Sequence, residues 1–66
     1  MEKLYKITDR AGAYISLPEN WTDRMVNCRL QARNVTWELC GDRIVGREKH
    51  SNRHYATLTY VGELQS

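Results

Sequence analysis

The sequence predicts an all-β fold, or a β-rich fold with one short helical turn, built as a small antiparallel barrel or a strongly twisted sheet of about five or six strands. Three observations support this class. Apolar and polar residues alternate through residues 26–45 with a period of two, as in half-buried strands. The pairs Arg33-Asn34 and Gly41-Asp42 interrupt this alternation where tight turns keep the apolar residues on one face. Short β-like runs also occupy both ends of the chain.

A hairpin is expected at the start of the chain. Residues 4–8 and 13–17 are β-like runs, and Asp9 and Gly12 between them are typical of turns. Pro18 ends the second run. We expect one turn of helix from Pro18 to Arg24, because proline suits a first helical position.

The middle of the chain is predicted to be a three-stranded meander that begins with a strand at residues 26–32. A turn at Arg33-Asn34 makes three apolar pairs face each other, namely Ala32 with Val35, Leu30 with Trp37, and Cys28 with Leu39. A turn at Gly41-Asp42 then makes Leu39 face Ile44 and Trp37 face Gly46. The second of these pairs lays an indole over a residue that has no side chain.

A helix that continues through Arg33 is the alternative for this region. Four residues have the spacing of one helical face, namely Trp21, Met25, Cys28 and Ala32. That assignment leaves Val26 and Leu30 off the apolar face, so the strand is the preferred interpretation.

The end of the chain is predicted to be a polar loop at residues 48–53 and a last strand at residues 54–61. Residues 1–62 are expected to form a single small β-domain, and residues 63–66 a frayed tail. Both tryptophans, Trp21 and Trp37, are expected in or beside the core.

A chain of 66 residues has a thin core, so its apolar face must be closed within the chain or covered in a homodimer. No run is apolar enough to span a bilayer, and the polar first residues do not resemble a secretory signal. We therefore expect a cytoplasmic protein with no membrane partner.

The cysteines and histidines predict no metal site. Cys28 and Cys40 are expected to be free thiols that behave as small buried hydrophobes, because the predicted strands place them on opposite faces. His50 and His54 have the spacing of half a zinc site, but the cysteines lack the close spacing of a zinc knuckle. No nucleophile is paired with a base. We expect no cofactor and no catalytic residues, in a protein that is not an enzyme.

Positive charge is concentrated in the later two thirds of the chain, although the net charge is only +2. Seven of the ten cations are arginine, whose planar fork suits phosphates and base edges. Residues 47–55 are the richest in hydrogen-bond donors and are predicted to form a hairpin tip. Asn27, Arg29 and Gln31 form a second surface if residues 26–32 are a strand. The predicted nucleic-acid contacts are Arg10, Arg29, Arg33, Arg47, Lys49, Arg53, His54 and Tyr55. Tyr55 and Tyr60 are expected to stack on single-stranded bases.

The run at residues 12–21, Gly-Ala-Tyr-Ile-Ser-Leu-Pro-Glu-Asn-Trp, and the run Arg24–Leu30 resemble the core of AbrB-like swapped-hairpin domains. The resemblance covers about residues 4–39. In that family a strand ending in Leu-Pro leads into a short helix and a further strand, and two chains interlock to make a DNA-binding β-surface. The resemblance implies a homodimer whose first hairpin loop, Arg10 above all, contacts DNA. The chain has Thr22-Asp23 where the family has Gly-Asp.

Two function classes follow from these observations. The first is a small nucleic-acid-binding accessory or regulatory protein of prokaryotic or phage type, which contacts the phosphates of DNA or RNA through arginines on loops and strand faces. The alternative, favoured by the thin core and the aromatic content, is a protein-interaction module: a small inhibitor, adaptor or subunit that docks through a sheet edge or its aromatic face. The salt dependence of binding distinguishes the two function classes, because phosphate binding weakens steeply as the salt concentration rises and apolar docking does not.

Overall fold

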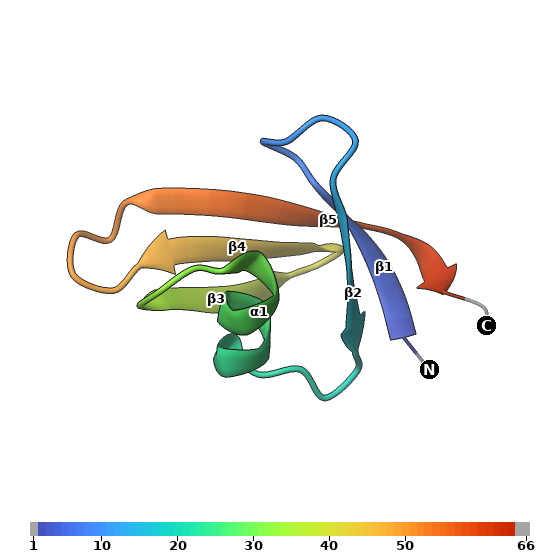
Figure 1. Cartoon of the computed structure of the whole chain (residues 1–66), viewed down its shortest axis with the longest axis horizontal. Helices are drawn as coiled ribbons and strands as arrows, with labels where there is room; N and C mark the ends of the chain where they lie inside the picture. The colour runs from blue at the N-terminus through green and yellow to red at the C-terminus, as the bar shows by residue number, and fades with distance from the viewer. Residues whose placement is uncertain (1, 65–66) are drawn as a thin grey trace.

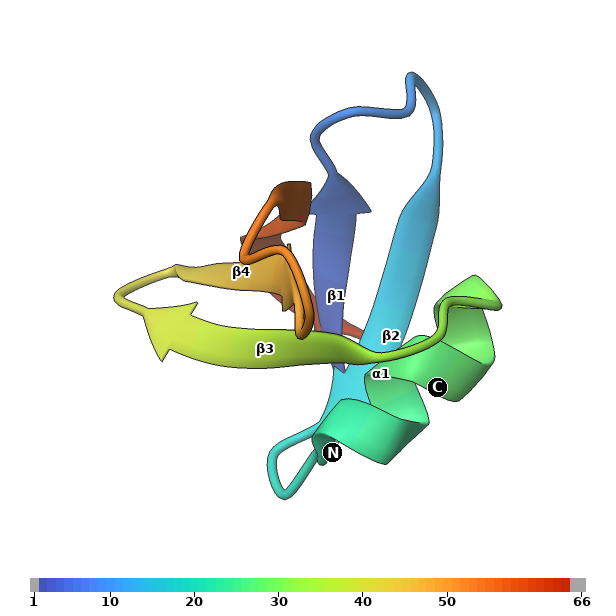
Figure 2. The same ribbon diagram turned by 90° about the vertical axis from the view of Figure 1, so that its left-hand side faces the viewer.

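The computed structural model describes residues 2–64, which form one antiparallel sheet of five strands with one short helix (Figure 1). The elements follow in the order β1 (Glu2–Ile7), β2 (Tyr14–Pro18), α1 (Asp23–Leu30), β3 (Val35–Cys40), β4 (Arg43–Glu48) and β5 (His54–Leu64). In space the strands have the order β2-β1-β5-β4-β3, and β1 and β2 cross β3 and β4 steeply (Figure 2). The predicted class, a β-rich and strongly twisted sheet, is confirmed. The strands do not close into a barrel.

The first hairpin is confirmed. β1 and β2 are antiparallel, and Tyr5 lies opposite Ile15. The turn is closed by a hydrogen bond from the N–H of Ala13 to the carbonyl of Arg10 at 3.1 Å. β2 runs through Pro18, and the helix does not begin before Asp23, so the prediction of a helical turn from Pro18 to Arg24 is wrong.

The turn at Gly41-Asp42 is also confirmed. β3 and β4 pair with Leu39 opposite Ile44 and Trp37 opposite Gly46, as the alternation predicts. Gly41 has a φ of 65°, a backbone conformation that glycine adopts without steric cost.

The predicted strand at residues 26–32 is wrong, because these residues form most of α1 and the loop that follows it. Thr22 caps the helix by accepting a hydrogen bond from a backbone N–H of the first turn at 3.3 Å, and Asp23 places negative charge at the positive end of the helix dipole. Gln31 ends the helix in the left-handed conformation, with a φ of 56°, and its N–H donates to carbonyls of the last turn. The predicted hairpin turn at Arg33-Asn34 therefore does not exist.

The alternation of apolar and polar residues predicted a strand here because α1 buries so few residues. Val26 is fully buried, at 0% exposure, and Leu30, one turn later, packs against the edge of the core. Met25 and Cys28 are exposed, so the helical face that their spacing suggests is not the buried one either. An apolar stripe this narrow does not distinguish a helix from an alternating strand.

Side chains of α1 bind the backbone of the edge strand β3. The amide of Asn27 donates to the carbonyl of Val35 at 3.1 Å and accepts from the indole N–H of Trp37 at 2.7 Å. Asp23 Oδ1 accepts from the backbone N–H of Trp37 at 3.2 Å. These bonds satisfy two backbone groups that an edge strand otherwise exposes.

The other edge strand, β2, is bound from the opposite end of the helix. The guanidinium of Arg29 donates to the carbonyl of Ser16, and its Nη1 lies 3.4 Å from Glu2 Oε1. α1 therefore contacts both edges of the sheet and lies in the opening between them (Figure 2).

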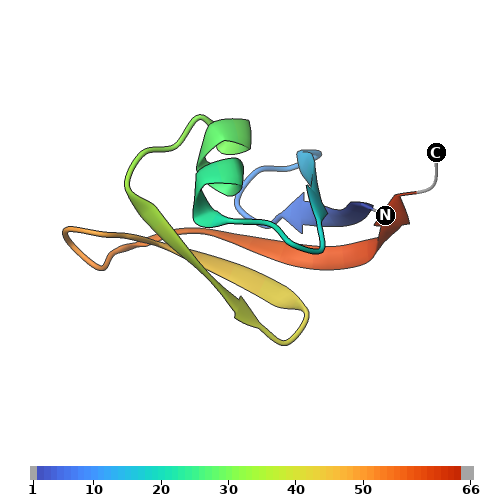
Figure 3. The ribbon, with the colours of Figure 1, turned by 90° about the horizontal axis from the view of Figure 1, so that it is seen from below.

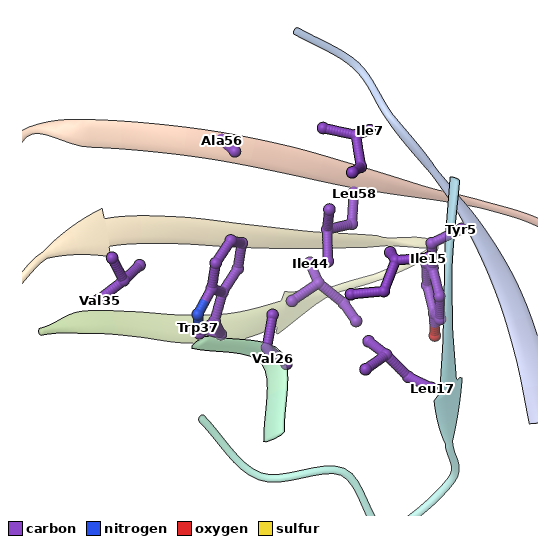
Figure 4. Packing of buried hydrophobic residues seen from close by; sticks show 10 residues of the cluster. All are labelled: Tyr5, Ile7, Ile15, Leu17, Val26, Val35, Trp37, Ile44, Ala56 and Leu58. Carbon is purple, nitrogen blue, oxygen red and sulfur yellow. The ribbon is translucent and has the colours of Figure 1, made fainter. Parts of the chain in front are cut away.

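The core lies between α1 and the concave face of the sheet. Its buried residues are Tyr5, Ile7, Ile15, Leu17, Val26, Val35, Trp37, Ile44, Ala56 and Leu58 (Figure 4). Trp21 packs against this cluster from the loop before α1, so the expected position of both tryptophans in or beside the core is confirmed. The opposite face of the sheet is not covered by the helix (Figure 3).

Two smaller expectations concern the cysteines and the chain end. Cys28 and Cys40 are free thiols as predicted, but both are exposed, so their predicted burial is wrong. β5 contains the predicted last strand and continues to Leu64, two residues into the segment expected to be a tail. Residues 65 and 66 lie outside the described residues.

Replacing Gly46 with alanine should destabilise the protein, because a Cβ there would lie 2.5 Å from Cζ3 of Trp37. Overpacking a core contact costs about 1–3 kcal/mol, which urea denaturation will show as a lower free energy of unfolding. In a Trp37→Leu background the same Gly46→Ala substitution should cost much less. Equal costs in the two backgrounds would mean that the indole is not the obstacle.

Replacing Asn27 with alanine should loosen α1 from β3. The indole N–H of Trp37 and the carbonyl of Val35 would both lose their partner, at about 1–3 kcal/mol for a buried group left unsatisfied. The control is Asn20→Ala, which alters an exposed asparagine in the loop before the helix. Thermal unfolding at the same temperature for both variants would contradict the role given to Asn27.

Candidate nucleic-acid interface

Two loops meet at the end of the molecule where β4 turns into β5 (Figure 1). The β4–β5 loop, residues 49–53, is joined to the α1–β3 loop, residues 31–34, by a hydrogen bond from the N–H of Lys49 to the carbonyl of Asn34 at 2.8 Å. Asn34 adopts a φ of 55°, which asparagine tolerates better than most residues. The bond brings Arg33 and Lys49, which are far apart in the sequence, to one end of the protein.

A pocket of about 460 Å³ lies between these loops and the start of α1. It is lined by Asp23, Arg24, Asn27, Ala32, Arg33, Asn34 and Lys49. Three of these residues are cations that come from three separate parts of the chain. The carboxylate of Asp23 is engaged by the backbone N–H of Trp37, at 3.2 Å.

A second pocket, of about 240 Å³, shares Lys49 with the first. It is lined by Thr36, Glu38, Val45, Arg47, Glu48, Lys49 and Asn52. Because Lys49 lines both pockets, Arg47 continues the row of cations that begins at Arg24. We call the group Arg24, Arg33, Arg47, Lys49 and Arg53 the basic end.

Hydrogen bonds within the β4–β5 loop give it a defined shape. The N–H of Glu48 donates to the carbonyl of Arg53 at 2.9 Å, and the N–H of Asn52 donates to the carbonyl of Glu48 at 2.8 Å. Asn52 has a φ of 55°, and the hydroxyl of Ser51 lies 3.4 Å from Glu48 Oε1. The cations of the loop therefore project from a turn that the loop itself stabilises.

The structure brings together Arg33, Arg47 and Lys49 of the predicted contacts at the two pockets, and Arg53 lies in the same β4–β5 loop, bound through its carbonyl to Glu48, with His54 next to it at the start of β5. His54 Nε2 lies 2.9 Å from the hydroxyl oxygen of Thr57.

The other predicted contacts lie elsewhere or are engaged. Arg10 is in the β1–β2 loop, on a separate part of the molecule (Figure 1). Arg29 binds Glu2 and the β2 backbone. Tyr55 is half-buried, and its ring packs edge-on against that of Trp37, with the ring centroids 6.1 Å apart.

Tyr60 and the surface expected at Asn27, Arg29 and Gln31 also have structural contacts. The ring of Tyr60 packs against Tyr5 with centroids 5.7 Å apart. Asn27 hydrogen-bonds to β3, and Gln31 caps the helix. Because residues 26–32 are not a strand, the three polar side chains do not form the wet face of one.

Most cations of the protein make no ion pair with another described residue. Within residues 2–64, the ion pairs join Lys3 to Glu19 at 3.8 Å and Arg29 to Glu2 at 3.4 Å. The remaining lysines and arginines are exposed and unpaired in that range: Lys6, Arg10, Arg24, Arg33, Arg43, Arg47, Lys49 and Arg53.

The acids are unevenly placed relative to these cations. The two pockets at the basic end are lined by three acids, Asp23, Glu38 and Glu48, and by four of its five cations, all but Arg53. The other five cations of the chain are equal in number to the other five acids, so the excess of two positive charges comes from the basic end.

Sequence reasoning missed Arg24. A strand at residues 26–32 gives no reason to bring Arg24 near Arg33 or Lys49. The signal that was present is the cap: Thr22 followed by Asp23 marks a helix start, which places Arg24 in the first turn.

No protein-family model matches the chain, and neither the curated proteins nor the solved structures contain a significant match to it. The resemblance to AbrB-like domains, with the dimer and the DNA contact of Arg10 that it implies, stays a prediction. No helix within residues 2–64 is long and apolar enough to cross a membrane.

Proposed function

We propose that the protein binds nucleic acid through the basic end, as an accessory or regulatory factor of prokaryotic or phage type without catalysis of its own. The observation that carries this proposal is the convergence of Arg24, Arg33 and Lys49 on one pocket, from α1 and from two loops. Phosphate oxygens accept hydrogen bonds from such side chains whatever the sequence of the nucleic acid.

The electrostatic repulsion among these cations supports the proposal, because a bound polyanion would relieve it. Three cations and one acid, Asp23, line the pocket, so like charges that repel each other are in excess, and none of the three cations is in an ion pair within the described part of the chain. The hydrogen bond between Lys49 and Asn34 nevertheless holds their loops together. A polyanion that binds across the pocket relieves the repulsion and releases its own counterions.

A protein-interaction module is the second candidate, and one observation favours it. Leu39 is 57% exposed near the end of β3, an edge strand whose helix contacts are at its beginning. An extended peptide of a partner could pair with such an edge. The aromatic face offers less, because Trp37 is buried at 4% exposure.

The test is nucleic-acid binding measured by fluorescence anisotropy at several salt concentrations, with single-stranded and duplex DNA and RNA. We expect the logarithm of the binding constant to fall linearly with the logarithm of salt concentration. The variant Arg33→Gln/Lys49→Gln should bind more weakly and lower this slope by about 2.

The matched control is Lys3→Gln/Arg10→Gln, which removes the same charge away from the basic end. It should bind nearly as the native protein does, since the Lys3 ion pair is exposed and contributes little. Equal losses in the two double variants would show that binding does not depend on the basic end, and a larger loss in the control would favour the DNA contact of Arg10 that the resemblance to AbrB-like domains implies. No binding of any nucleic acid at low salt would overturn the proposal, and binding to a protein that persists in high salt and is lost in Leu39→Ser would favour the second candidate.

A further inference from the structure

The face of the sheet that points away from α1, which we call the outer face, carries charged residues that take no part in the packing of the core. On each strand, the residues that alternate with the buried ones point to this outer face. By this rule the outer face contains Lys6, Tyr14, Thr36, Glu38, Cys40, Arg43, Val45, Arg47, Thr57 and Thr59. Figure 3 shows α1 on the other side of β4 and β5, and seven of these ten residues are exposed, all but Val45, Thr57 and Thr59.

Strand pairing places five of these residues in one row across the whole sheet. The row reads Tyr14, Lys6, Thr59, Arg43 and Cys40, and each member lies opposite the next on the neighbouring strand. Side chains paired in this way have Cβ atoms about 4.5–5.5 Å apart. The backbones at Lys6 and Arg43, two strands apart, are therefore about 10 Å from each other, with a threonine hydroxyl between them.

The charge of the outer face is positive. Lys6, Arg43 and Arg47 are exposed and in no ion pair within residues 2–64. The pleat also directs two carboxylates to this side, Glu38 and Glu2, and Glu2 is paired with Arg29. Glu48 lines the same pocket as Arg47 and Glu38, so three unpaired cations face two free carboxylates, and this excess of positive charge complements a chain of phosphates.

Tyr14 adds an aromatic ring to this row. It is 53% exposed on the edge strand β2, opposite Lys6 on β1. An exposed ring stacks on a nucleobase only if the face of that base is free, and in a duplex the neighbouring bases cover it. The pairing of a free ring with a neighbouring cation therefore favours a single strand over a duplex.

We propose that single-stranded nucleic acid lies across the outer face, with a base on Tyr14 and with phosphates on Lys6, Arg43 and Arg47. This inference rests on the proposed function and specifies its substrate class. Arg47 belongs to the outer face and to the basic end, so one molecule of single-stranded nucleic acid can contact both surfaces. The side chains of Thr57 and Thr59 are small, so they leave room for the single-stranded nucleic acid to cross the centre of the outer face.

The experiment compares a labelled twelve-nucleotide oligo(dT), the corresponding oligo(U) and a twelve-base-pair duplex at low salt. The native protein should bind at least one single strand more tightly than the duplex. Tyr14→Leu should weaken single-strand binding by about fivefold or more, and Tyr14→Phe, which keeps the ring, should not. Arg43→Gln should also weaken it, more than the charge-matched Arg10→Gln does. These residues are exposed, so the variants should unfold at the same temperature as the native protein.

Two outcomes would overturn the inference while the proposed function stands. One is duplex binding as tight as that of both single strands. The other is native-like single-strand binding by Tyr14→Leu and Arg43→Gln while Arg33→Gln/Lys49→Gln binds weakly. If the native protein binds none of the three probes, the proposed function itself fails. Preference for oligo(U) or for oligo(dT) decides whether the supporting result concerns RNA or DNA.

Discussion

The fold depends on one short helix that fills the opening between the two edges of a sheet too small to close on itself. An isolated helix of eight residues is unstable in water, and α1 buries only Val26 fully. Its position is fixed by polar side chains instead. Asn27 and Asp23 bind the backbone and the indole of β3, and Arg29 binds the backbone of β2. The indole in turn lies over Gly46, where a side chain would collide with the ring. Each polar contact of α1 with a strand backbone therefore satisfies a backbone group of an edge strand and holds the helix over the core.

The same contacts determine where the charges lie. Because α1 ends at Leu30 and β3 begins at Val35, only a short loop is left to carry Arg33 and Asn34. Its conformation is completed by the hydrogen bond from Lys49. The basic end is therefore a product of helix placement, and its cations are held by backbone geometry. The backbone of these loops therefore loses less conformational freedom on binding than the backbone of a free loop would.

The sequence predicts the parts of this fold that local pattern controls. The first hairpin and the turn at Gly41-Asp42 follow from turn chemistry, and the pairing of Trp37 with Gly46 follows from that turn. The helix does not follow, because Val26 and Leu30 also fit an alternating strand, and what holds α1 is a set of bonds to residues distant in the chain. The site shows the same division. Arginine enrichment in the later part of the chain predicts Arg33 and Arg47, but their convergence with Arg24 depends on that helix. The row on the outer face depends on pairing between β1 and β5, which no local pattern specifies.

The low net charge constrains how a nucleic acid can be recognised. With a net charge of +2, the protein attracts a polyanion only weakly at long range, and at physiological salt exposed charges are screened beyond about 8 Å. Binding energy must then come from groups close to the ligand. The basic end supplies unpaired cations at short range, and the outer face supplies an exposed ring beside further cations. Five of the eight acids lie outside the pockets of the basic end, and there they weaken general attraction to nucleic acid. A ligand that contacts both surfaces is therefore favoured over one that meets positive charge alone.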